Sequence, residues 1–83
     1  MEIDRVSPVP PYQQIAGHLR AAILSGELAP GARLPGVAAL VQEYGVARTT
    51  ARKALTVIRQ EGLSFASVGM GYYVAPREQW PQG

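Results

Sequence analysis

The sequence contains no cysteine, so neither a disulfide nor a thiolate metal site can stabilise the fold. No apolar run approaches the roughly 18 residues that a membrane span needs. The first residues, MEIDRVSP, lack the basic start and the apolar stretch of a signal peptide. What remains is an ordinary composition, 47% hydrophobic and 17% charged over 83 residues. It predicts one small, soluble intracellular domain.

Groupings of residues typical of catalytic and metal sites are also missing. His18 is the only histidine, so it has no second imidazole with which to share a metal. The six acidic residues are scattered over different predicted elements, and no spaced pair supports general acid–base catalysis. Ser25, Ser64 and Ser67 have no neighbouring base and are expected to be surface hydroxyls. The sequence therefore predicts no enzyme, no bound metal and no cofactor.

The net charge of +2 conceals an uneven distribution. Arg48, Arg52, Lys53 and Arg59 lie within a 13-residue segment that contains no acidic residue and so carries +4. The other 70 residues hold four basic and six acidic side chains, a net charge of −2. Such a concentration of positive charge favours a phosphate-binding surface, although a basic, solvated helix face has the same composition.

Hydrophobic periodicity predicts three helices in the first sixty residues. The first begins at Pro11 and ends at Gly26, the second spans residues 36–44, and the third spans residues 48–60. The third helix is amphipathic. Its apolar face consists of Ala51, Ala54, Leu55 and Ile58, and its polar face of Arg48, Thr49, Arg52, Lys53, Thr56 and Arg59.

After Gly62 the period changes to two. Residues 63–67 alternate, residues 68–71 form a Gly-containing turn, and residues 72–74 resume an extended pattern, which predicts a β-hairpin. A short extended piece is expected at Arg33–Leu34, because Pro35 disfavours helix there. Residues 77–83 are interpreted as a polar tail with one Trp.

Helix, helix, tight turn, helix and hairpin is the order of a winged helix-turn-helix domain, an α+β fold. We expect an N-terminal arm at residues 1–10, the winged domain at residues 11–75 and a tail at residues 76–83. In this fold the helix at residues 48–60 enters the major groove of double-stranded DNA, and the hairpin at residues 63–75 flanks it. Val46, in the turn, is available to fill the core between the two helices.

The start of the third helix suits contacts with bases. Arginine can fork onto guanine, and threonine can serve phosphates or a thymine methyl group. We expect Arg48 and Arg52 to read or position bases. The residues expected to bind DNA are Arg33, Arg48, Thr49, Thr50, Arg52, Lys53 and Arg59.

The chain resembles the DNA-binding domain of the GntR family of bacterial transcription regulators, and within it the HutC-like branch. The matching segments are Pro11-Tyr-Gln-Gln-Ile15, Leu19-Arg20, Ile23-Leu-Ser-Gly-Glu-Leu28, Pro30-Gly31, Arg33-Leu-Pro35, Tyr44-Gly-Val46, Arg48-Thr-Thr50, Arg52-Lys-Ala-Leu55, Glu61-Gly-Leu63 and Gly69-x-Gly71 to Val74. The resemblance implies a homodimer on an inverted-repeat operator, usually a repressor, at the nucleoid in the bacterial cytoplasm. It adds Gly69 and Gly71, at the wing tip, to the expected DNA-binding residues.

Three positions depart from the family pattern on the helices. Gly36 and Ala47 stand where relatives have a helix-capping Ser or Thr, and Ala38 stands where relatives carry a DNA-contacting Arg. The wing, usually rich in Arg, Gln or Lys, has no charge at residues 65–71. Fewer cationic phosphate contacts predict binding that is weaker than that of a typical relative, or more dependent on dimerisation or on an accessory factor.

Further interpretations stay open. One hypothesis is that Val68 and Met70, at the wing tip, press an apolar edge against sugars or against a partner protein. Relatives carry an effector-binding domain after the wing, whereas this sequence ends about nine residues past Val74. We therefore expect no small-molecule effector domain in this chain, which is either an excised domain or a short member of the family. The alternative function is a winged-helix protein-interaction module with weak or no DNA binding.

Overall fold

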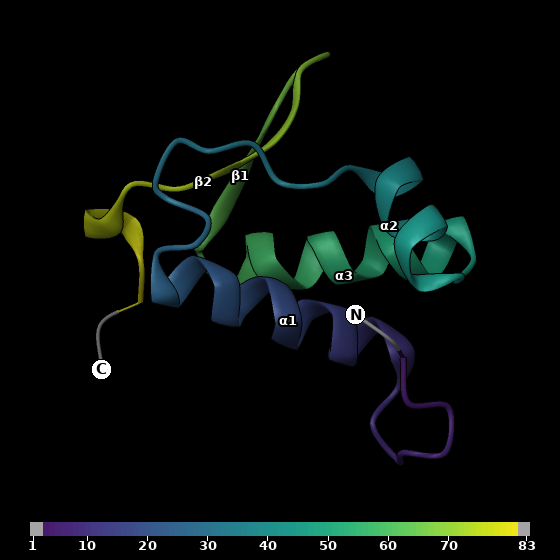
Figure 1. Cartoon of the computed structure of the whole chain (residues 1–83). Helices are drawn as coiled ribbons and strands as arrows, with labels where there is room; N and C mark the ends of the chain where they lie inside the picture. The colour runs from purple at the N-terminus through teal and green to yellow at the C-terminus, as the bar shows by residue number, and fades with distance from the viewer. Residues whose placement is uncertain (1–2, 82–83) are drawn as a thin grey trace.

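The computed structural model describes residues 3–81, and Figure 1 shows a hairpin that projects from a group of helices. The elements are α1 (Pro11–Ser25), α2 (Val37–Tyr44), α3 (Arg48–Gln60), β1 (Ser64–Ser67), β2 (Gly71–Val74) and the short 3-10 helix η1 (Arg77–Gln79). The predicted α+β winged helix-turn-helix fold is confirmed. Residues 1–2 of the predicted arm and 82–83 of the predicted tail lie outside the described residues.

The helix ends follow the local sequence. Pro11 occupies the first position of α1, where a missing N–H costs nothing, and Gly26 ends the helix with φ +89°. The second helix begins one residue later than predicted, at Val37. Gly36 is extended (ψ −178°) and forms its N-cap, accepting the N–H of Leu40 on its carbonyl. Gly45 (φ +66°) ends α2 and lets the chain turn directly into α3.

A single hydrophobic core lies between the helices and the base of the hairpin. Its largest fully buried side chains are Ile15, Ile23, Leu34, Leu40, Leu55, Ile58 and Val74. Val46 is buried in the turn between α2 and α3, as predicted. Of the four tyrosines, only Tyr44 is buried, and the other three are half-buried. The predicted apolar face of α3 is entirely buried, which leaves its polar face outward.

At its base the wing contains a third extended segment beside the two strands of the hairpin. The strands β1 and β2 pair antiparallel with Phe65 opposite Tyr73, and Arg33 forms an isolated bridge to Tyr73 on the other edge of β2. The predicted extended piece at Arg33–Leu34 therefore pairs with β2 through a single β-bridge at Arg33. One expectation is wrong: Ser64 is 5% exposed and not a surface hydroxyl, because it lies on the inner face opposite buried Val74.

Both flanks of the domain are folded against it. Trp80 packs on the core, and its indole Nε1 donates a hydrogen bond to the carbonyl of Ala75 at 2.8 Å. At the other flank the Gln14 side chain binds both backbone groups of Asp4, each at 2.8 Å. The arm thus lies along the start of α1. Within residues 3–81, no helix is long and apolar enough to cross a membrane.

Candidate nucleic-acid interface

The outward face of α3 carries the concentrated positive charge. Arg48, Arg52, Lys53 and Arg59 are all exposed, while the residues between them on the other face are buried. Successive residues are rotated by about 100°, so Arg48, Arg52 and Arg59 share one flank of this face and Lys53 lies on the other. No acidic residue of α3 offsets them.

Four polar side chains of α3, two of them cationic, surround a shallow groove on the helix surface. Thr49, Arg52, Lys53 and Thr56 line an open hollow of about 240 Å³. The Thr56 hydroxyl donates a hydrogen bond to the carbonyl of Arg52 at 3.0 Å. Two cationic and two hydroxyl-bearing side chains can together contact phosphates and base edges.

The first turn of α3 is open to a ligand. Its N-cap residue, Ala47, is extended (φ −68°, ψ 156°) and has no side chain able to cap the helix. The N–H groups of Arg48, Thr49 and Thr50 stand at the positive end of the helix dipole, where anions bind favourably. Arg48 and Thr49 are exposed and Thr50 is half-buried, so all three side chains are accessible.

Lys53 is oriented by a neighbouring aromatic ring. Its Nζ lies 4.2 Å from the ring centroid of Tyr12, in the first turn of α1, a cation–π geometry. The half-buried Tyr12 ring therefore holds the ammonium on the flank of α3 nearest α1. No pairing of this kind restricts Arg48 or Arg52 among the ion pairs and ring contacts of residues 3–81.

The remaining predicted residues lie away from the start of α3. Arg33 belongs to the wing, and its guanidinium lies 3.2–3.6 Å from the position that a Cβ would take on Gly71. Gly69 (φ +74°) is in the turn at the wing tip. Arg59 is in the last turn of α3, roughly 16 Å along the helix axis from Arg48. The predicted DNA-binding residues thus lie on three parts of the domain: the start of α3, the wing, and the end of α3 at Arg59.

Sequence reasoning missed one cation near the interface. Arg5, in the arm, donates a hydrogen bond from Nη2 to the carbonyl of Gly45 at 3.0 Å, in the turn that leads into α3. Asp4 shapes this arm, since its carboxylate accepts the N–H groups of Val6 and Ser7. No periodicity in residues 1–10 points to this contact, because it joins residues forty positions apart.

Two pairs of titratable side chains away from α3's polar face contact each other. Arg20 binds both carboxylate oxygens of Glu61, at 2.8 and 2.6 Å, and this hydrogen bonding raises the pKa of the Arg20 guanidinium. His18 stacks on Tyr44, and burial raises the pKa of the Tyr44 hydroxyl, with the charge of Glu43 adding to the effect. Among residues 3–81 no three side chains are grouped to hold a metal ion.

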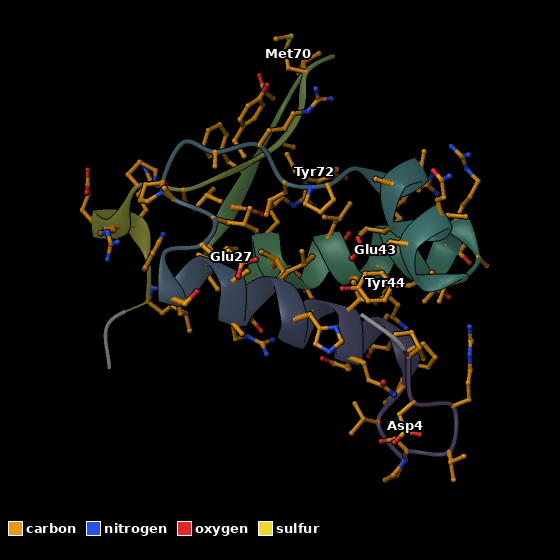
Figure 2. All side chains as sticks on the ribbon, in the orientation of Figure 1. Asp4, Glu27, Glu43, Tyr44, Met70 and Tyr72 are labelled. Carbon is orange, nitrogen blue, oxygen red and sulfur yellow. The ribbon has the colours of Figure 1, made fainter. Side chains whose placement is uncertain are left out.

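Two acidic side chains line a pocket on another part of the molecule. Glu27 and Glu43 line a separate pocket of about 180 Å³ with Tyr44, between α1 and α2. Figure 2 shows these three labelled side chains on the same side of the ribbon. The α3 groove is lined by basic and hydroxyl-bearing residues alone. The lining of the α3 groove therefore carries positive charge and no acidic residue, which favours the binding of a polyanion.

A winged helix-turn-helix fold with an exposed basic third helix defines a DNA-binding domain. Comparison with known proteins identifies the family: residues 11–74 match the family model described as "Bacterial regulatory proteins, gntR family". The chain belongs to the GntR family.

Its relatives include named repressors. The HTH-type transcriptional repressor NagR of Bacillus subtilis is 37% identical over 75 residues, which are 90% of this chain and 31% of NagR. The mannosyl-D-glycerate transport/metabolism system repressor MngR of Escherichia coli is 43% identical over 65 residues, 78% of this chain and 27% of MngR. The chain thus spans about a third or less of the length of these relatives.

Solved structures agree with this assignment. YtrA from Sulfolobus acidocaldarius, a GntR-family transcription factor, superposes with a TM-score of 0.83 at 35% identity, over 90% of this chain and 79% of YtrA. The DBD of AraR in complex with operator ORX1 superposes with a TM-score of 0.83 at 29% identity, over 90% of this chain and 95% of that chain.

Proposed function

We propose that this GntR-family domain binds double-stranded DNA sequence-specifically, as a homodimer on an inverted-repeat operator. The observation that carries the proposal is the face of α3, which has four exposed cations beside Thr49 and Thr56 and no acidic residue. The AraR structures, in which a DBD of similar fold is in complex with operator DNA, support the same use of this surface.

Each predicted residue has a role in this proposal. Arg48 and Arg52 contact base edges in the major groove, and Thr49 and Thr50 contact phosphates or thymine methyl groups. Lys53 and Arg59 bind phosphates along the helix, and Arg33 binds a phosphate beside the wing. Gly69 and Gly71 keep the wing tip thin enough to approach the backbone. Arg5 is added as a further phosphate contact next to the turn before α3.

The regulator that contains this domain represses transcription in the bacterial cytoplasm and is not an enzyme. Relatives named as repressors support this assignment. The histidine utilization repressor of Klebsiella aerogenes, 35% identical over 71 residues, supports the HutC-like branch. Within the chain we assign residues 11–75 to the DNA-binding domain, residues 1–10 to the arm and residues 76–83 to the tail.

The test is selection of binding sequences from a randomised duplex library at low salt. An enriched inverted repeat supports a dimeric operator reader. Enrichment of a single half-site contradicts the dimer, and salt-sensitive binding with no enrichment contradicts sequence specificity. If no duplex is retained, the alternative holds, and the domain is a protein-interaction module.

A further inference from the structure

The only lysine of the chain lies on the polar face of α3. The other cations of this helix are arginines, and Lys53 alone has a compact ammonium on a flexible four-carbon stem. It is also the one cation on its flank of the face, because Arg48, Arg52 and Arg59 share the other flank. A helix in the major groove lies between two sugar-phosphate backbones. We therefore expect Lys53 to serve the backbone that the three arginines do not face.

An aromatic ring fixed by the core lies beside this ammonium. The Lys53 Nζ is 4.2 Å from the ring centroid of Tyr12. Tyr12 is half-buried and packs against the hydrophobic core, so the domain itself holds its ring in place. Its hydroxyl accepts a hydrogen bond from Nε2 of Gln13 at 3.3 Å. The ring thus connects the first turn of α1 to the middle of α3.

The contact with the ring leaves the ammonium available to a ligand. An ammonium has three N–H donors, and a ring on one side of it leaves donors for a phosphate oxygen. Lys53 is exposed, and it also lines the groove of α3 with Thr49, Arg52 and Thr56. The same side chain therefore contacts the ring and borders the proposed DNA surface.

We propose that Tyr12 is a positioning residue for DNA binding, whose ring holds the ammonium of Lys53 ready for a phosphate on the α1 side of the major groove. A long, flexible side chain loses conformational entropy when a complex orders it, and ordering it beforehand reduces that loss. Tyr12 then raises the affinity without adding a charge or contacting the duplex. The inference rests on the proposed DNA binding by α3.

A double-mutant cycle on duplex affinity measures this coupling. We expect Tyr12→Leu to weaken binding about threefold and to leave the slope of log K against log salt unchanged, because the charge of Lys53 remains. Lys53→Gln is expected to lower the slope by about 0.9. In the Lys53→Gln background Tyr12→Leu should have no further effect. In the Arg59→Gln background, the matched control, the threefold effect should persist. Tyr12→Phe retains the ring and should bind as the wild type does.

The contact can also be observed in the protein without DNA. Reductive methylation with isotope-labelled formaldehyde modifies Lys53 as the only lysine, together with the N-terminal amine, and keeps the positive charge. Protons above an aromatic ring resonate upfield in NMR spectra. We expect the methyl signal of Lys53 to be shifted upfield in the wild type and to return to its ordinary position in Tyr12→Leu. Lys53→Gln lacks this signal and so assigns it.

Three results would overturn the inference. An equal loss of affinity from Tyr12→Leu with and without Lys53 would show that the ring acts only on the fold. Unchanged or tighter binding in Tyr12→Leu would show that the ring does not prepare Lys53 for DNA, and an unshifted methyl signal in the wild type would show that the contact is absent in solution. Failure of the wild type to bind any duplex contradicts the proposed function itself, and the NMR signal distinguishes that failure from a missing contact.

Discussion

At the scale of single residues, Ser64 is the polar side chain least suited to its surroundings. It is 5% exposed, and its hydroxyl has no hydrogen-bond partner among the described residues. A buried hydroxyl without a partner loses its hydrogen bonds to water on folding and gains none in the protein, so it destabilises the folded state. We expect Ser64→Ala to raise the free energy of unfolding by about 1 kcal/mol in urea denaturation. Ser67→Ala, at a half-exposed site on the same strand, is the control. A loss of stability in Ser64→Ala would show that the hydroxyl has a partner.

The start of α3 lacks a side-chain N-cap, although its backbone has the conformation that a capping residue needs. Ala47 already has the extended conformation of an N-cap residue, and no side chain bonds the first turn. In Ala47→Ser the hydroxyl can accept an N–H from Thr49 or Thr50, and we expect a gain of about 1 kcal/mol in unfolding free energy. Thermal unfolding monitored by circular dichroism measures it. Ala38→Ser, at an exposed position of α2, is the control; equal effects at both sites would contradict the capping argument.

At the scale of elements, Trp80 attaches the η1 segment to the domain. Its indole packs on the core, its N–H binds the carbonyl of Ala75, and the Arg77 guanidinium lies 5.2 Å above its ring. We expect Trp80→Ala to lower the free energy of unfolding by about 2 kcal/mol, because a half-buried ring and a hydrogen bond are lost together. Trp80→Phe retains the ring and should lose about 1 kcal/mol. A change below about 0.5 kcal/mol in Trp80→Ala would place the segment outside the folding unit.

The elements that the sequence predicted well are those whose signal is local. The 3.6-residue period of α1 and α3 and the glycines at positions 26 and 45 mark helix faces and ends, and the structure has them where the pattern places them. The strands also follow the local change of period after Gly62.

The features that escaped prediction depend on contacts distant in sequence. The pairing of Arg33 with Tyr73, the docking of Trp80 and the contact of Arg5 with Gly45 leave no periodic trace. Ser64 was misplaced because a polar residue in a short strand carries no sign of which face it occupies. In the candidate interface, the cations of α3 follow from charge and period, whereas the partnership of Lys53 with Tyr12 does not.

At the scale of the whole molecule, the positive charge is concentrated on α3, and its four cations are all exposed. The exposed cations of α3 lie on a face without acidic neighbours on that helix, while Glu27 and Glu43 line a pocket between α1 and α2. Arg20 is neutralised by Glu61, so it does not contribute a free cation. The α3 face can therefore bind a polyanion although the net charge of the chain is only +2.

The most direct test of that surface is the salt dependence of duplex binding by wild-type protein, Arg52→Ala and Arg77→Ala, measured by fluorescence anisotropy. Each variant removes one positive charge from an exposed site, but Arg77 lies on η1, at the opposite end of the molecule from α2 in Figure 1. We predict that Arg52→Ala weakens binding and lowers the salt slope by about 0.9, that Arg48→Ala with Arg52→Ala abolishes binding, and that Arg77→Ala changes neither quantity. Equal affinities and slopes in all of these proteins would contradict DNA binding by α3.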